Sequence, residues 1–406
     1  MLKIKSDVIG LFNFLTNIIL IFLLGAIFLS SNAHGKIQCG GPFKSFLLDI
    51  KEASVSMGYN VELVNDFFSS AQIDPAVLKA DQSQKIFRKS FIDFSNAVIS
   101  PHRLQNAGIN KRRYKETFSK IKRQYGVPKE ILLAFWALET DFGLFQGEYN
   151  TLNALLTLSH DCRRPELFLP QVFGALELFK QNKFHPRKTK GAWAGEIGML
   201  QMLPLDLLEN GTDGDGDGDV DITSSPIDAL FSMAEKLTSM GWKRNQPWLL
   251  EVRVPESMDW SQTGLSPAMP IEHWKNLNVR PRVGSFQTGA DVSLILPMGR
   301  KGPAFLIYPN YKVLLNWNNS FVYVTTASYF ATLLSNEPRY RLGSPEPMLS
   351  SSEMLLLQSK LHQKGYIVGK IDGILGKKTR EAVKIKQKEL GIPADGWPTK
   401  YLLQNL

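Results

Sequence analysis

The sequence predicts a mainly helical protein with a smaller β component (mainly α, α+β), followed by a small helical unit at the C-terminus. Apolar residues recur at helical spacing over residues 43–118 and 127–184. Between 248 and 329, short apolar runs rich in β-branched and aromatic residues alternate with Gly and Pro, as expected of short strands. A separate helical pattern over 350–406 follows a predicted linker at 341–349.

The strands are expected in four short runs, because each is apolar and bounded by turn residues. These runs are VSLILP (292–297), AFLIYP (304–309), KVLLNW (312–317) and FVYVTTA (321–327). They are predicted to pack beside the helices.

Length and charge narrow the class of protein. The chain has 406 residues, more than one ordinary domain needs, and 44% of them are hydrophobic, which is typical of globular protein. The net charge of +9 favours an anionic partner, such as nucleic acid, a membrane surface or an acidic wall polymer. Charge alone does not choose among these.

The N-terminus predicts export. Lys3 and Lys5 precede a stretch without charged side chains, residues 8–33, which ends in small residues at 31–33 (SNA). This pattern is typical of a secretory signal peptide over residues 1–33. The alternative is an uncleaved membrane anchor, since the stretch is long enough to span a bilayer.

Two cysteines, Cys39 and Cys162, remain after the signal. In an oxidising compartment an isolated pair is expected to form a structural disulfide, and neither residue lies in a CxxC redox motif. Lys36 and Gln38 disfavour lipidation at Cys39.

An apolar helix is predicted between Pro128 and Gly143, and it places Glu139 near its C-terminal end. Phe135 and Trp136 precede Glu139 by four and three residues, so both rings are expected beside it. Burial and the negative end of the helix dipole both raise the pKa of a carboxyl, as a general acid requires. The alternative is a helix-terminal Glu turned toward solvent.

The segment AFWALETDFG (134–143) resembles the catalytic-helix motif of the lytic murein transglycosylase B family, whose Glu is the sole catalytic acid. Three further stretches are similar to family motifs and occur in the family's order: GAWAGEIGMLQMLP (191–204), DGDGDGDVDITSSPIDAL (213–230) and GPAFLIYPNYKVLLNWNNSFVY (302–323). The resemblance covers about residues 40–335. It implies a lysozyme-like catalytic domain, which we assign to residues 39–340.

The resemblance also implies the reaction. The enzyme would cleave between N-acetylmuramic acid and N-acetylglucosamine in peptidoglycan, and the C6 hydroxyl of the muramyl residue would close a 1,6-anhydro ring. Most glycosidases need two carboxylates. A lytic transglycosylase needs one, here Glu139, because the substrate supplies the nucleophile, and no cofactor is expected for catalysis.

Five further side chains are carried over to the substrate cleft by their match to family motifs: Gln201, Trp317, Asn318, Ser320 and Tyr323. The alternative for Trp317 and Tyr323 is that they are aromatic core residues of strands. The sequence departs from the family at Ala192, Met202 and Lys236, where members carry Ser, Phe and Tyr.

The Asp-rich loop predicts a structural Ca²⁺ site. Asp213, Asp215, Asp217 and Asp219 alternate with Gly, and hard oxygen ligands at such spacing suit Ca²⁺. The family's longer loop implies Asp228 as the distal ligand. The alternative is a solvated acidic turn.

Residues 350–406 resemble the three-helix peptidoglycan-binding domain family. The matching residues include Leu357-Gln358, Gly365-Tyr366, Gly369-Lys370-Ile371-Asp372-Gly373, Gly376, Thr379, Gln387 and Asp395-Gly396. Lys386 replaces the aromatic residue that usually precedes Gln387. The alternative is a structural cap on the enzyme.

Together these observations predict a periplasmic enzyme of a Gram-negative envelope whose partner is the peptidoglycan glycan strand. We expect a monomer, no nucleic-acid partner, and membrane contact only if the N-terminal segment stays uncleaved. Two alternatives are a hydrolytic muramidase on the same fold and a non-catalytic wall-binding scaffold. A zinc-dependent amidase is disfavoured because the six His residues show no ligand spacing.

Overall fold

The computed structural model describes residues 37–83 and 89–406. The signal peptide or anchor predicted at residues 1–33 lies outside this part of the chain. Within it, no helix combines the length and the apolar character that crossing a membrane requires.

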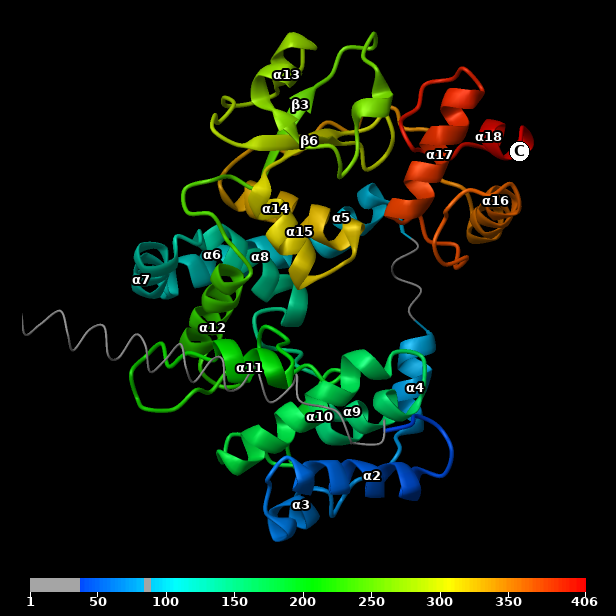
Figure 1. The fold of residues 1–406 in the computed structure, drawn as a ribbon. Coiled ribbons are helices and arrows are strands. Elements are labelled where there is room, and N and C mark those ends of the chain that lie inside the picture. Colours follow the sequence, from blue (N-terminus) through cyan, green and yellow to red (C-terminus); the bar gives the residue numbers. More distant parts are fainter. Residues whose placement is uncertain (1–36, 84–88) are drawn as a thin grey trace, which may run out of the picture.

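Helices make up most of the described part of the chain before residue 250 (Figure 1). They are α2 (Phe43–Ser56), α3 (Val61–Phe67), α4 (Pro75–Gln82), α5 (Phe91–Val98), α6 (Pro101–Arg113), α7 (Lys115–Tyr125), α8 (Lys129–Thr140), α9 (Thr151–His160), α10 (Pro165–Lys180), α11 (Pro204–Asn210) and α12 (Pro226–Ser239). Two short strands, β1 (Tyr149–Asn150) and β2 (Lys190–Gly191), pair antiparallel between them. The helical periodicity of the sequence is confirmed.

The second part of the chain holds a five-stranded antiparallel sheet in the order β4-β6-β7-β3-β5. Its strands are β3 (Leu249–Arg253), β4 (Met269–Pro270), β5 (Arg280–Pro281), β6 (Asp291–Ile295) and β7 (Ala304–Ile307), with the short helices η2 (Trp260–Gln262) and α13 (Ile271–Asn276) beside them. Strands β6 and β7 fall in the first two of the four predicted runs.

The prediction of strands at 312–317 and 321–327 is wrong. These runs belong to α14 (Pro309–Trp317) and α15 (Phe321–Leu334). Pro309 stands in the first turn of α14, and the Ser320 hydroxyl accepts the Tyr323 amide at the start of α15. Because α15 is buried on nearly every face, its apolar run carries no clear period, and the β-branched residues then suggest a strand.

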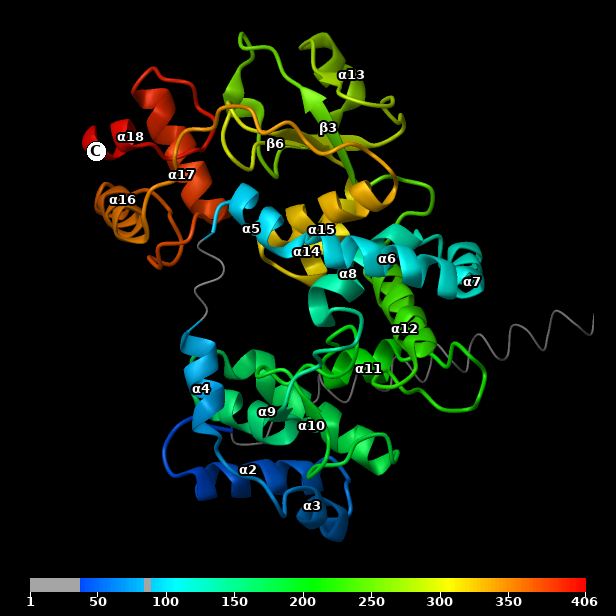
Figure 2. The same ribbon diagram turned by 180° about the vertical axis from the view of Figure 1, so that it is seen from behind.

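Helix α8 occupies the middle of the molecule. It packs against α15 and α6, while α9 and α10 pack against each other and against α4, α3 and α11. Figures 1 and 2 place α2, α3, α4, α9 and α10 at one end, the sheet at the other, and α5, α6, α8, α14 and α15 between them. The C-terminal end of α8 therefore faces the α9–α11 group of helices.

The predicted disulfide is confirmed. Cys39 and Cys162 are bonded, with their Cα atoms 5.2 Å apart. The bond joins the residues just before α2 to the end of α9, and the Gly40 amide donates to the His160 carbonyl beside it.

The C-terminal helices are α16 (Ser351–Gln363), α17 (Lys377–Glu389) and α18 (Lys400–Gln404), with a hydrophobic core of their own. Two glutamines make similar contacts in this region. Gln358 accepts the amides of Asp372 and Gly373, and Gln387 accepts the amide of Gly396, so each holds an Asp-Gly turn against a helix.

This C-terminal module is docked on the rest of the protein. The Arg380 guanidinium donates to the Pro297 carbonyl at 2.9 Å and lies 5.0 Å over the ring of Phe321, and Lys384 donates to the Thr263 carbonyl at 2.7 Å. The preceding residues 341–349 contain no helix or strand. They run along the preceding part of the chain, where the Ser344 amide donates to the Lys301 carbonyl.

Candidate active site

The last turn of α8 presents Glu139. Pro128 caps the helix, which begins at Lys129 and ends at Thr140, and its apolar residues are buried along the whole length. Asp141 then takes a left-handed conformation with φ of 51° and stops the helix. Glu139 thereby lies in the last turn of a buried helix, with its own side chain only partly exposed.

Two aromatic side chains from the distant end of the sequence hold the carboxyl of Glu139. The indole Nε1 of Trp317 donates to Oε1 at 3.3 Å, and the hydroxyl of Tyr323 donates to the same oxygen at 2.5 Å. Phe135, one turn before Glu139, packs edge-on against both rings. Trp136 pairs instead with the rings of Tyr114 and Phe142.

Burial raises the pKa of Glu139 from 4.5 to about 7. The hydrogen bonds from Tyr323 and Trp317 act in the opposite direction because they favour the carboxylate. The negative charge of Glu196 raises the pKa further, and the positive charge of Lys236 lowers it. A carboxyl with such a pKa exchanges its proton close to neutral pH, which suits both an acid and a base.

Asn318 and Ser320 organise the turn between α14 and α15. The Ser320 amide donates to Asn318 Oδ1 at 2.9 Å, and the Ser320 hydroxyl accepts the Tyr323 amide at 3.3 Å. These bonds fix the start of α15 and so aim Tyr323 at Glu139. Both residues also line a groove that extends toward the C-terminal module.

Gln201 lies in the Gly-rich loop that faces the end of α8. Its backbone φ is 51°, and its Nε2 donates to the carbonyls of Gln146 and Gly198 at 3.1 and 2.8 Å. The Thr140 hydroxyl bonds the Met199 carbonyl at 2.6 Å and ties this loop to α8. The side-chain amide of Gln201 thus braces the loop through its nitrogen.

Sequence reasoning missed two ionisable groups near Glu139. Lys236, noticed only as a departure from the family, places its ammonium 4.4 Å from the ring centre of Trp317. Glu196 lies in the same loop as Gln201, and burial raises the pKa of its carboxyl. The only available signal for Glu196 was an acidic residue within an otherwise apolar Gly-rich loop.

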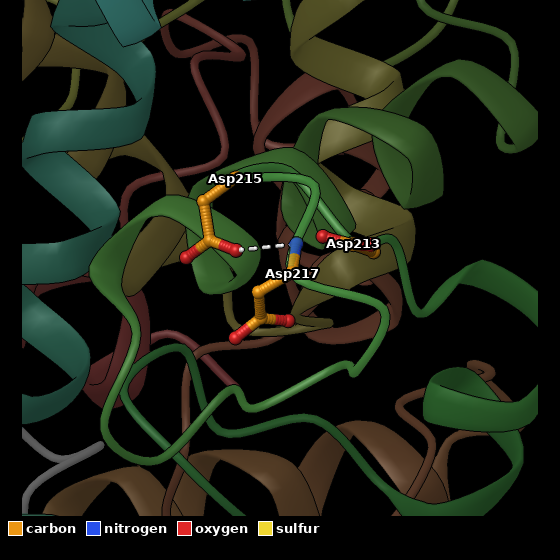
Figure 3. A group of neighbouring side chains, drawn as sticks. All are labelled: Asp213, Asp215 and Asp217. Atoms are coloured by element: carbon orange, nitrogen blue, oxygen red, sulfur yellow. Dashed lines mark hydrogen bonds between the residues drawn. The ribbon is translucent and has the colours of Figure 1, made fainter.

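The Asp-rich loop brings three of its predicted ligands together. Asp213, Asp215 and Asp217 each offer an oxygen within 4.8 Å of the others, as Figure 3 shows. The Gly216 and Gly218 amides donate to Asp213 and lower its pKa, which keeps that carboxylate charged. Such a set of charged oxygens fits a hard cation such as Ca²⁺.

Asp219 and Asp228 are not part of this group of oxygens. Asp228 is buried at the start of α12, where its carboxylate accepts the amides of Gly214 and Asp221, each at 2.9 Å. These bonds close the two ends of the loop on each other, so the geometry gives Asp228 a structural part in the loop.

Comparison with known proteins follows the same division of the chain. The family model described as a transglycosylase SLT domain matches residues 42–332. The chain belongs to this family. A family model for a peptidoglycan binding domain matches residues 350–406. The α8 helix, the Gly-rich loop and the Trp317–Tyr323 segment all lie within the transglycosylase match.

Structures of SltB3 from Pseudomonas aeruginosa are similar over nearly their whole length. The complexes of SltB3 with NAG-anhNAM-pentapeptide and with NAG-NAM-pentapeptide are both 32% identical to this chain, with a TM-score of 0.83. They cover 90% of this chain and 99% and 100% of the respective SltB3 chains. The α+β, mainly helical fold with its C-terminal helical module is thereby confirmed.

A curated relative is the membrane-bound lytic murein transglycosylase B of Escherichia coli (strain K12). It is 26% identical over 228 residues, which are 53% of this chain. The chain spans 63% of the length of that relative.

Proposed function

We propose that this protein is a lytic transglycosylase that cleaves the β-1,4 bond between N-acetylmuramic acid and N-acetylglucosamine and leaves a 1,6-anhydro end. The observation that carries the proposal is the environment of Glu139. Its carboxyl has a pKa of about 7 and is held by two aromatic donors at the end of a buried helix. Membership of the transglycosylase family supports the same reaction.

Glu139 is proposed to act first as acid and then as base. The protonated carboxyl gives its proton to the glycosidic oxygen, and the bond from that oxygen to C1 of the muramyl residue breaks. The resulting carboxylate takes the proton of the muramyl C6 hydroxyl, whose oxygen forms the new bond to C1. No water enters the products, and Glu139 ends the cycle protonated.

Product analysis tests the proposal directly. Purified sacculi digested with the enzyme are expected to release 1,6-anhydromuropeptides, which mass spectrometry separates from hydrolytic products by the mass of one water. Products with reducing ends alone would overturn the transglycosylase proposal and favour the muramidase. No release at all, from a folded protein, would favour the wall-binding scaffold.

The protein is further proposed to be a monomer that works in the periplasm on peptidoglycan glycan strands. The Cys39–Cys162 bond supports an oxidising compartment. Fractionation of cells that express the full chain, with mass spectrometry of its N-terminus, tests both export and cleavage after residue 33.

The Asp-rich loop is proposed to bind Ca²⁺ in a structural role. Asp213, Asp215 and Asp217 would hold the ion, and its charge would offset the repulsion among their carboxylates. Because the loop leads into α12, ion binding would stabilise that helix and the residues it carries toward the cleft.

A further inference from the structure

The side chain of Lys236 lies largely shielded from solvent between α11 and Trp317. It projects from α12, and its Nζ lies 2.6 Å from Asp206 Oδ2 of α11 and 4.4 Å from the ring centre of Trp317. Only 14% of the Lys236 side chain and 23% of the Asp206 side chain are exposed. An ammonium over an indole face is attracted by the ring electrons, and the attraction is stronger where water is largely excluded.

The contact extends in both directions. On one side, Trp317 contacts both residues: its ring faces Lys236, and its Nε1 donates to Glu139 Oε1 at 3.3 Å. On the other side, Asp206 also accepts the Leu203 amide at 3.1 Å and so holds the start of α11, which directly follows the Gln201 loop. Lys236 therefore joins the two segments that face Glu139.

We propose that Lys236 is a positioning residue, which keeps the indole of Trp317 turned toward Glu139. The proposal rests on the proposed function of Glu139. Lys236 does not touch the reacting atoms, and it acts through the ring of Trp317 and through its charge.

Several charged or titratable groups surround this carboxyl. They are Tyr323 of α15, Lys236 of α12 and Glu196 of the Gly-rich loop. Arg103 of α6, which pairs with Asp141 at the end of α8, acts on Tyr323. Among those that act on Glu139, Lys236 lowers its pKa and Glu196 raises it. Loss of the Lys236 charge therefore raises the pKa of Glu139 and shifts the alkaline limb of activity to higher pH.

Lys236→Met tests the proposal because methionine keeps most of the apolar stem and removes the charge. We expect kcat to fall by between about 2-fold and 30-fold, with a smaller change in KM, and the alkaline limb to move upward. Lys236→Arg is expected to restore much of the rate, since a guanidinium also stacks on an indole.

Lys275→Met is a matched control. Lys275 also lies over an aromatic ring, 5.6 Å from the centre of Phe286, and pairs with an acid, Glu272, at 2.7 Å, but it belongs to the sheet region. This variant is expected to keep the wild-type rate and pH profile. Equal losses in Lys275→Met and Lys236→Met would overturn the proposal, because they would indicate general destabilisation.

A double-mutant cycle completes the test. In a Trp317→Phe background, Lys236→Met is expected to cost much less than in the wild type, because the indole that it positions is absent. Additive effects would contradict the positioning role. If wild-type enzyme forms no anhydro product, the proposed function fails; if it does and Lys236→Met matches it in rate and pH profile, only the positioning role fails.

Discussion

Tyr323 and Trp317 donate to the same oxygen of Glu139, Oε1, at 2.5 and 3.3 Å. An oxygen that accepts two hydrogen bonds is a poor place for the acid proton, so in the protonated form the proton belongs on Oε2. The two donors thus favour Oε2 as the oxygen that carries the acid proton, and they also lower the pKa of the carboxyl.

Tyr323→Phe removes one of these donors. Because the lost bond favoured the carboxylate, the pKa of Glu139 should rise above about 7, and activity that needs the acid form should persist to higher pH. The pH profile of anhydro-product release measures the shift. Tyr59→Phe is the matched control, since Tyr59 also donates to a carboxylate, Glu177, at 2.8 Å, away from the cleft. A downward shift in Tyr323→Phe would contradict the assignment.

Glu139→Gln removes the acid while it keeps the shape of the side chain. General acid catalysis contributes about 10²–10⁴-fold, so release of 1,6-anhydromuropeptides should fall by at least about 100-fold. Glu148→Gln, at a side chain that is 87% exposed, is expected to retain activity. Substantial activity in Glu139→Gln would remove this residue from the mechanism.

The same substitution should stabilise the protein at alkaline pH. Glu139 keeps its proton to about pH 7 in the folded state, while an ordinary Glu loses it near 4.5. Between these values the folded state binds more protons than the unfolded state, so stability falls as pH rises and stays reduced above pH 7. Gln carries no such penalty. We expect Glu139→Gln to raise the melting temperature at pH 8 and to leave it unchanged at pH 4, measured by thermal scans.

Loss of the Cys39–Cys162 bond should destabilise the N-terminal helices. The bond closes a separation of 123 residues, and disulfides typically stabilise by about 2–4 kcal/mol. Cys39→Ser with Cys162→Ser, followed by urea unfolding, measures the loss. Reductant should reproduce it in the wild type and have no effect on the double variant.

Calcium should raise the melting temperature of chelator-treated protein. Asp215→Asn and Asp217→Asn are expected to weaken this shift, because each removes charge from the group of three carboxylates. Asp259→Asn, in the sheet region, serves as the control. A melting temperature that is indifferent to Ca²⁺ would leave the loop as an acidic turn.

The sequence was sufficient to predict those features that depend on local chemistry. The position of Glu139 at the end of an apolar helix follows from the residues next to it in the sequence. The Cys39–Cys162 bond follows because no other cysteine competes for either partner. The helices α14 and α15 were missed, because burial on most faces removes the periodicity that separates a helix from a strand.

The hydrogen-bond partners of Glu139 could be identified only from the tertiary structure. Trp136, three residues before it, turns toward Tyr114 and Phe142, while Trp317 lies 178 positions away along the chain and yet bonds to its carboxyl. The contact between Lys236 and Trp317 likewise joins two helices that no local pattern connects.

The docking of the C-terminal module has a mechanical consequence. When a binding module is joined to a catalytic domain by a flexible linker, the linker length sets the volume that the catalytic domain can sample. Here Arg380 bridges the module to Phe321, two residues before Tyr323, and Lys384 secures it to the Thr263 carbonyl. A glycan strand gripped by the module would meet Glu139 at a spacing that the fold determines. The distance between the bound module and the cleaved bond would then be fixed by the fold. The length of residues 341–349 would have little influence on where the protein cuts the strand.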